Sequence, residues 1–314
     1  MVQKNISPIL IVTGPTSVGK TELTVDLARQ INGEIISADA FQIYKELNLG
    51  TAKPTREHRD AVPHHLVDII SFQEKESFSV NKFLSLAMEK VNEILSRGRL
   101  PIIVGGTTLY LRALLHGLFE GPGGNESLRK NLLALARKKG KQVLHQKLNQ
   151  VDPERARSVH PNDIFRLVRA LEIYELTGKP MSTHWKTTHS PLKEFQTIKI
   201  GLIRDRASLY YCAEKRIDRM IKQGLLEEIR ILYGHGFNET RQAAAALGYR
   251  QLLPVIKGER SLEQGMVLFR QNTRHLIKRQ LTWIHHEPGF QLIPLDSQNP
   301  DNLLKLKRAI SMPS

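Results

Sequence analysis

The chain has 314 residues, of which 40% are hydrophobic and 25% are charged. This composition is typical of one large globular domain, or of a core with an insertion, and no apolar run approaches the length of a membrane span. The net charge of +15 favours a polyanionic partner such as nucleic acid, which a small-molecule kinase would not need, although an unspecialised basic surface would also produce it.

The cysteine content and the N-terminal segment indicate the cellular compartment. Cys212 is the one cysteine of the chain, which excludes an internal disulfide and suits a reducing environment. The apolar run after Lys4 is short and leads directly into a glycine-rich motif, so we interpret it as a strand and not as a cleavable signal. We therefore expect a cytoplasmic protein without a membrane segment.

The first predicted element is a short buried strand at residues 9–12, and a phosphate-binding motif follows it. Residues 14–21 match the P-loop pattern G-x-x-x-x-G-K-S/T, and a helix is predicted from residue 22 to 32. The two glycines allow backbone angles that a Cβ would forbid, so that N–H groups and the helix N-terminus can bind phosphate oxygens. The flanking strand and helix argue against a chance glycine-rich turn. The predicted diphosphate site consists of Gly14, Pro15, Thr16, Ser17, Val18, Gly19, Lys20 and Thr21, with Lys20 at the outer phosphate and Thr21 holding Mg²⁺.

Strands and helices alternate in the next hundred residues. The patterns predict strands at 34–39, 64–70 and 101–104, and helices at 78–97 and 107–115. This alternation indicates an α/β protein with a parallel sheet. We therefore expect a P-loop NTPase-like parallel sheet that is flanked by helices and carries a small helical insertion.

The composition changes at the glycine-rich residues 121–124, and a helical, strongly charged stretch runs from 126 to 159. We interpret residues 119–160 as the helical insertion and residues 1–118 with 161–314 as the core. The basic face of the insertion would contact nucleic acid or simply be solvated. The remaining elements are predicted as a helix at 163–177, an irregular loop at 182–191, a strand at 197–203, and helices at 207–233, 247–256 and 261–285.

The last predicted helix has a basic face and an apolar stripe. Arg270, Arg274 and Lys278 recur every four residues and therefore share one face. The apolar stripe consists of Ile277, Leu281 and Ile284. This division would let the helix pack through one side and present cations on the other.

One carboxylate is expected beside the P-loop. In a P-loop ATPase an acid at the end of a buried strand holds Mg²⁺, but the strand at 101–104 ends without one. Asp68 lies within a predicted strand and could face either side, whereas Asp39 ends the strand after the P-loop helix. The carboxyl ends of parallel strands open on one crevice, so Asp39 is placed to act as a general base on an acceptor beside the phosphates. A helix-capping or turn aspartate is the structural alternative.

With these motifs together, the sequence resembles the tRNA dimethylallyltransferases, a family also called tRNA isopentenyltransferases. The motifs occur in the order of the family and span most of the chain. They are Gly14–Thr21, Ser37–Tyr44, Gly50–Pro54, His64–Leu66, Val104–Tyr110, Arg166–Glu172, Leu247–Tyr249 and Lys278–Trp283.

The resemblance implies the reaction and the residues that serve it. The exocyclic amine of the adenosine 3′-adjacent to the tRNA anticodon attacks dimethylallyl diphosphate, and pyrophosphate leaves; Mg²⁺ is the cofactor. Asp39 matches the proton acceptor, Thr21 the hydroxyl near metal and diphosphate, and Arg166 and Arg206 match basic residues near the leaving group. The residues that the resemblance assigns to tRNA are Asp39, Ala40, Phe41, Gln42, Thr107, Arg166, Arg169, Gly248, Tyr249, Arg274, Lys278 and Arg279. The implied partners are the anticodon arm and dimethylallyl diphosphate, and we expect a monomer.

Two residues depart from the family pattern within this site. Ala40 follows Asp39 where the family has serine, and Cys212 replaces an arginine expected beside the diphosphate, whereas Arg216 is retained. These changes leave open a tRNA-binding paralogue that catalyses poorly. A P-loop small-molecule kinase is the other alternative, although the basic excess argues against it.

Overall fold

The computed structural model describes residues 8–74, 78–119, 121–238, 241–296 and 301–311. The chain divides into two compact units, of which the first comprises residues 1–112 with 192–314 and the second residues 113–191. The described helices include none that is both long and apolar enough to cross a membrane.

The first unit is built on a six-stranded sheet, all of whose strand pairs are parallel. In spatial order the strands are β3 (His64–His65), β2 (Gly33–Ser37), β4 (Leu100–Gly105), β1 (Ile9–Thr13), β5 (Thr197–Ile203) and β6 (Gln291–Pro294). The predicted α/β class with a parallel, helix-flanked sheet is thereby confirmed. Because the strands are parallel, the loops after β1, β2 and β4 leave the same edge of the sheet.

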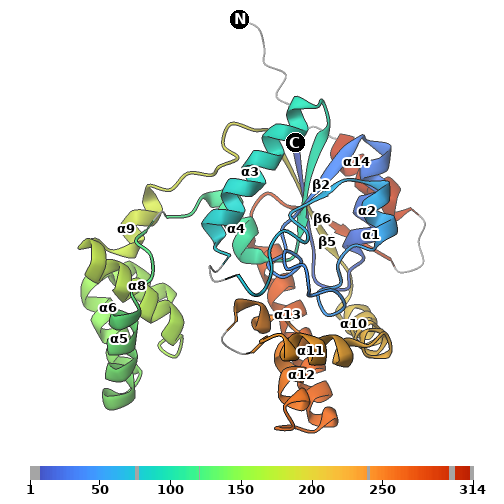
Figure 1. The fold of residues 1–314 in the computed structure, drawn as a ribbon. Coiled ribbons are helices and arrows are strands. Elements are labelled where there is room, and N and C mark those ends of the chain that lie inside the picture. The colour runs from blue at the N-terminus through green and yellow to red at the C-terminus, as the bar shows by residue number, and fades with distance from the viewer. Residues whose placement is uncertain (1–7, 75–77, 120, 239–240, 297–300, 312–314) are drawn as a thin grey trace, which may run out of the picture. The chain divides into compact units, whose positions relative to one another are not determined.

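Helices cover both faces of this sheet. Figure 1 shows α1, α2 and α14 on one side and α3 on the other. The helices of the first unit are α1 (Lys20–Gln30), α2 (Arg56–Ala61), α3 (Val80–Ser96), α10 (Arg206–Lys222), α11 (Leu225–Gly234), α12 (Tyr249–Ile256), α13 (Leu262–His286) and α14 (Asn302–Ser311), with a 3₁₀ turn at Gln242–Ala245. Helix α4 (Thr108–His116) begins in the first unit and ends in the second.

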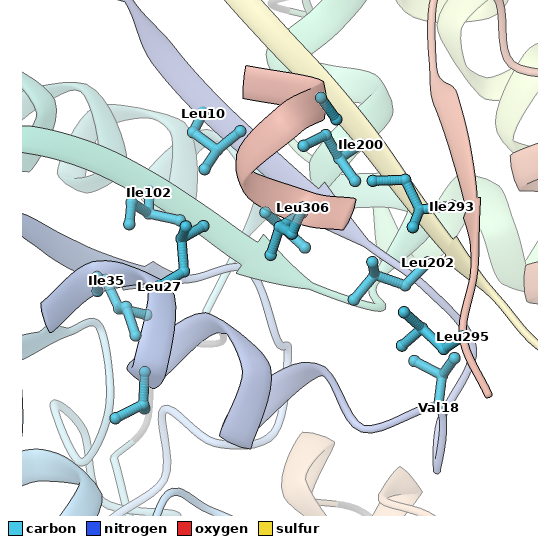
Figure 2. Close-up of a cluster of buried hydrophobic side chains, with 14 of the residues drawn as sticks. Leu10, Val18, Leu27, Ile35, Ile102, Ile200, Leu202, Ile293, Leu295 and Leu306 are labelled. Atoms are coloured by element: carbon cyan, nitrogen blue, oxygen red, sulfur yellow. The ribbon is translucent and has the colours of Figure 1, made fainter. Parts of the chain in front are cut away.

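Apolar side chains from distant parts of the sequence form the core between the sheet and α1 and α14. Leu10 and Ile102 lie on adjacent strands, and Leu306 from α14 packs into the same cluster (Figure 2). These side chains are fully buried, which contributes roughly 1.5–3 kcal/mol for each. The core therefore supports β1, the strand from which the P-loop emerges.

Two predicted elements of the first unit differ in the structure. Only residues 64–65 of the expected strand at 64–70 form β3, because Leu66 and Asp68 adopt left-handed backbone angles, with φ of 61° and 58°. The helix expected at 207–233 is divided into α10 and α11 at Gly224, whose φ is 100°. The apolar stripe predicted on α13 is confirmed: Ile277 and Ile284 are buried, and Leu281 packs against the same core.

The second unit consists of the C-terminal end of α4 and five further helices. These are α5 (Glu126–Lys139), α6 (Gln142–Val151), α7 (Pro153–Ser158), α8 (Ile164–Thr177) and α9 (Met181–Lys186). The unit is wider than the expected insertion at 119–160, because Leu167 and Leu171 of α8 pack into one core with Leu132 of α5 and Leu148 of α6. The loop expected at 182–191 instead begins with α9.

Candidate active site

The P-loop connects β1 to α1 with the backbone geometry that its glycines permit. Gly19 has a φ of 98°, which is unfavourable for a residue with a Cβ. Gly14 is needed for a different reason, since a Cβ there would lie 2.8 Å from the carbonyl oxygen of Leu202. Lys20 Nζ donates hydrogen bonds to the carbonyl oxygens of Gly14 and Pro15, both at 2.9 Å, so its ammonium lies over the loop.

The P-loop opens on a cavity of about 640 Å³ in the first unit. Its walls come from the P-loop, the segment after β2, the residue 48–55 loop, the end of β4 and one face of α10. Among the predicted site residues, those that line it are Thr16, Ser17, Gly19, Lys20, Thr21, Asp39, Phe41 and Gln42. The structure therefore brings the predicted phosphate site and the predicted base to one cavity.

Asp39 lies two residues beyond the end of β2, in a tight turn. Its Oδ1 accepts hydrogen bonds from the backbone N–H groups of Phe41 at 2.9 Å and Gln42 at 3.3 Å. Burial raises the pKa of Asp39 above the ordinary value of 3.8, although these N–H groups and the Lys20 ammonium act in the opposite direction. Asp39 therefore stabilises the turn and also lines the cavity. Its raised pKa makes the carboxylate a better proton acceptor.

Gln42 and Thr107 are held by hydrogen bonds near Asp39. The Gln42 amide accepts from Ser37 Oγ at 3.0 Å and donates to the Thr51 and Ala52 carbonyls at 3.4 and 3.3 Å. Thr107 Oγ1 accepts from the backbone N–H of Ala40 at 3.0 Å. Both side chains are thus oriented by the loops that surround the cavity, and their contacts to RNA stay predictions.

One face of α10 forms a wall of the cavity. The residues of α10 that line the cavity are Cys212, Arg216, Arg219 and Met220, which recur at the spacing of helical turns, and Gln223 lines it directly after the helix. Burial lowers the pKa of Arg216, and its Nε has no hydrogen-bond partner among the described residues. Arg206, by contrast, is exposed at the first residue of α10 and does not line the cavity.

Gln280 is a site residue to which the sequence analysis assigned no role. From α13 its Oε1 accepts from the Thr16 N–H and its Nε2 donates to the Gly106 carbonyl, both at 2.9 Å. It therefore connects the P-loop to the turn after β4. A signal was present in the sequence, because Gln280 falls on the buried stripe of α13 with Ile277 and Ile284, where a polar side chain needs partners.

The P-loop lysine has a lowered pKa. Burial, and then the charge of Arg216, lower the pKa of Lys20 to about 8. The ammonium is charged below that pH and loses its charge as the pH rises through it. We expect the affinity for inorganic pyrophosphate, measured by calorimetry, to fall as the pH rises above about 8.

Lys20→Met is the control for this pH dependence. It should bind pyrophosphate more weakly at every pH and should lack the additional loss above pH 8. The same pH profile in wild type and variant would exclude Lys20 as the titrating group.

Gly248 and Tyr249 begin α12 and are held within the protein. The Tyr249 ring is fully buried, and its hydroxyl donates to Glu228 Oε1 at 2.5 Å and accepts from the N–H of Gly50 at 3.2 Å. Glu228 also accepts from the Leu49 N–H at 3.1 Å. In this structure Tyr249 thus anchors the loop at 48–55, and its predicted contact with tRNA stays a prediction.

The basic face of α13 is less free than its spacing indicated. Arg270 forms an ion pair with Asp218 at 2.7 Å, and Arg274 forms one with Glu214, both on α10. Lys278 and Arg279 are exposed. The four-residue spacing predicts that the cations share a face of the helix. It contains no information about the carboxylates, Asp218 and Glu214, that α10 places beside that face.

Within the described residues Lys278 has no acidic partner, whereas Arg270 has one, so Lys278 should matter more if α13 contacts phosphates. We expect Lys278→Gln to weaken the binding of all tRNAs alike and to flatten the slope of log affinity against log salt by roughly 0.7–0.9. Arg270→Gln is the matched control, and its effect should be smaller because Asp218 already neutralises that charge. Equal slopes in wild type and the Lys278 variant would identify this face as ordinary solvated surface.

Arg166 and Arg169 belong to α8 of the second unit. Arg166 is exposed and lies 3.4 Å from Asp163, the residue that caps the helix. Arg169 pairs at 2.6 Å with the buried Glu172, which Arg129 also contacts through two bonds of 2.8 and 3.0 Å. Arg166 is therefore accessible at the surface. The Arg169 side chain, by contrast, forms contacts that stabilise the second unit.

The fold and the cavity define a P-loop protein of the α/β class, in which the phosphate loop shares a cavity with a partly buried carboxylate. A family model described as IPP transferase matches residues 42–287. The chain belongs to the IPP transferase family, which confirms the resemblance found in the sequence.

Several relatives extend this result over nearly the whole chain. The tRNA dimethylallyltransferase 1 of Pelobacter propionicus is 43% identical over 280 residues, which cover 89% of this chain and 90% of the relative. A tRNA dimethylallyltransferase of Thermoanaerobacter sp. is 45% identical over 278 residues, 88% of either chain. Among solved structures, the full-length tRNA isopentenylpyrophosphate transferase from Bacillus halodurans has a TM-score of 0.72 at 37% identity, covering 97% of this chain and 96% of its own. A eukaryotic dimethylallyltransferase acting on tRNA has a TM-score of 0.77 at 28% identity, covering 97% and 78%.

Proposed function

We propose that this protein transfers a dimethylallyl group from dimethylallyl diphosphate to tRNA, at the exocyclic amine of the adenosine 3′-adjacent to the anticodon, and releases pyrophosphate. Membership of the family supports dimethylallyl transfer to tRNA. The observation that carries the chemical assignment is the meeting of the P-loop and Asp39 in one cavity. A diphosphate site beside a general base is the arrangement that this reaction requires.

The proposed step forms a bond between the amine nitrogen and the allylic carbon. The bond between that carbon and the diphosphate oxygen breaks, and its electron pair leaves with pyrophosphate. Asp39 accepts the proton that the amine loses, which its raised pKa favours. Lys20 and Arg216 face the growing negative charge of the leaving group and lower the barrier by electrostatic stabilisation.

The residues around the P-loop are compatible with the expected Mg²⁺. The Thr21 hydroxyl and the Asp39 carboxylate line the cavity, and Ser17 Oγ is a buried oxygen without a partner among the described residues. No cluster of three or more His, Cys, Asp or Glu suited to a metal occurs in the described ranges. Such a sparse oxygen set suits Mg²⁺, which is commonly held by one or two side chains together with substrate phosphates. When bound, the ion would neutralise charge on the diphosphate, and Thr21 would hold it.

The nucleic-acid partner accounts for the charge of the chain. A net charge of +15 provides the electrostatic attraction that binds a phosphate backbone. The target base must leave its stack to reach Asp39, and Phe41 and Gln42 are the cavity residues that would receive it. The exposed cations Arg166, Lys278 and Arg279 would then grip the anticodon arm by its backbone.

The decisive experiment incubates the purified protein with tRNA and labelled dimethylallyl diphosphate. We expect the label to appear in tRNA at the adenosine next to the anticodon, and a tRNA with guanosine at that position should remain unlabelled. Labelled ATP in place of the prenyl donor should transfer nothing. Absence of label with dimethylallyl diphosphate would contradict the proposed activity.

A second candidate is a tRNA-binding paralogue with weak catalysis, which Cys212 favours because a thiol stands where the family has an arginine in the cavity wall. Tight tRNA binding without transfer in the same experiment would select it.

A further inference from the structure

The junction between β5 and α10 places another arginine beside the cavity wall. Arg204 directly follows β5, and its Nη1 donates to Cys212 Sγ at 3.7 Å. Cys212 itself lines the cavity, one helical turn before Arg216. Arg204 itself does not line the cavity, so its guanidinium lies behind Cys212, at the point of the wall where residue 212 carries no charge.

Among the described residues, Arg204 has no carboxylate within ion-pair distance, unlike Arg270 and Arg274. Within the described residues, the contact with Cys212 is its one hydrogen bond, and its Nε is buried without an acceptor. The neighbouring Asp205 caps α10, where it accepts from the Ser208 N–H at 2.8 Å. Hydrogen bonds from Ser208 are the main cause of its lowered pKa, and the charge of Arg204, which acts through its field, is a minor one.

Such an arginine is expected to have an anionic ligand. A thiol sulfur is a weak acceptor, so it does not satisfy a guanidinium with five donors. A buried Nε–H without an acceptor costs free energy, and a nearby anion offsets the cost of holding the guanidinium there. The contact with Cys212 puts Arg204 beside the cavity, where Lys20 and Arg216 already provide positive charge.

We propose that Arg204 stabilises the bound diphosphate electrostatically from behind the cavity wall, and so supplies across Cys212 the positive charge that the side chain at 212 lacks. This inference rests on the proposed function and extends its diphosphate site by one residue. As the bond between the allylic carbon and oxygen breaks, the electron pair remains on the diphosphate, and Arg204 stabilises the charge that develops there.

The inference changes what the sequence led us to expect of Cys212. Without Arg204, a cysteine in place of arginine would leave the leaving group short of one cation, and Cys212→Arg would accelerate transfer. With Arg204 beside it, the new arginine duplicates a charge that is already present. Cys212→Arg should therefore change the wild-type rate little, but it should rescue a protein that has lost Arg204.

The test is a double-mutant cycle on Arg204 and Cys212, with two measurements for each protein. The first is the affinity for inorganic pyrophosphate by calorimetry, and the second is single-turnover transfer to saturating tRNA. We expect Arg204→Gln to weaken pyrophosphate binding about tenfold and to slow transfer by about 10²-fold, the lower end for the loss of one preorganised donor. Arg204→Gln/Cys212→Arg should recover most of both, and tRNA affinity should not change.

Two further variants separate charge from structure. Arg204→Lys keeps the positive charge and should lose less than Arg204→Gln in both measurements. Arg230→Gln removes an exposed arginine of α11 that pairs with Glu227, and it should behave as wild type. Thermal melting of each variant identifies any that is misfolded. If Arg204→Gln is misfolded, Arg204→Lys and wild type are compared instead.

The outcomes distinguish this inference from the proposed function. Wild-type pyrophosphate affinity in Arg204→Gln would overturn the inference, and so would an equal effect of Cys212→Arg in both backgrounds. A wild-type protein that transfers no dimethylallyl group, yet binds pyrophosphate through Arg204, would refute the proposed function and retain the inference.

Discussion

Asp39→Asn is expected to slow dimethylallyl transfer by about 10²-fold to 10⁴-fold, the usual range for the loss of a general base. The asparagine oxygen can still accept from the N–H groups of Phe41 and Gln42, so the turn after β2 is preserved. What is lost is the group that takes the amine proton. Single-turnover transfer with saturating tRNA measures the chemical step, and the affinity for tRNA should remain close to that of wild type.

Stability provides an independent check on this interpretation. The folded pKa of Asp39 is raised, so its ionised form costs stability at any pH above the ordinary value of 3.8. A neutral asparagine avoids that cost, and the melting temperature should not fall at neutral pH. A variant that is inactive because it is unfolded would instead have a lower melting temperature than wild type.

The pH dependence of the wild-type rate has a defined sign. The base must be ionised to accept a proton, so transfer should decline as the pH falls through a pKa above 3.8. Asp26→Asn, an exposed aspartate on α1, is the matched control and should leave rate and profile unchanged. Near-normal turnover by Asp39→Asn would remove Asp39 from the mechanism.

The second large effect is expected in the stability of the second unit. Glu172 is fully buried, and its carboxylate accepts from Arg129, Arg169 and the backbone N–H of Asn125. Glu172→Ala removes the acceptor that these donors share, although Arg169 keeps its bond to the Pro122 carbonyl, and should lower the free energy of unfolding of this unit by about 3 kcal/mol. We place the value at the lower end of the usual range because both arginines are partly exposed to water.

The two tryptophans make this measurement selective. Trp185 belongs to the second unit and Trp283 to the first. In a Trp283→Phe background, fluorescence during urea unfolding reports the second unit alone. Glu175→Ala on the exposed side of the same helix is the control, and its effect should stay within about 0.5 kcal/mol.

Acid should remove the difference between wild type and Glu172→Ala. Burial by itself would raise the pKa of Glu172, but hydrogen bonds from Arg129 and Arg169 outweigh it and leave the pKa below 4.5. Stability from a carboxylate with a lowered pKa is complete above the unfolded pKa and is lost as the pH falls through the folded one. A stability difference that persists far below pH 4.5 would show that packing, and not the ion pairs, produces it.

The parts of this protein that sequence alone determined are those in which structure depends on adjacent residues. The P-loop is one, because its glycines and the apolar run before it specify a strand, a turn and a helix within 13 consecutive residues, 9–21. The parallel sheet and the position of Asp39 followed from the alternation of strands and helices in the same way. The family resemblance then supplied roles for residues that no local pattern could connect.

Tertiary structure decided which side chains meet across long separations. Asp68 could not be oriented from its sequence, and the fold pairs it with Lys53 and Arg59. Gln280 reaches the P-loop across 264 residues. Arg270 was predicted to present its charge to RNA, but it pairs with Asp218 of α10, 52 residues away in the chain. The physical reason is that a periodic pattern records which side of an element is buried, whereas the partner of a polar group is set only when distant elements pack together.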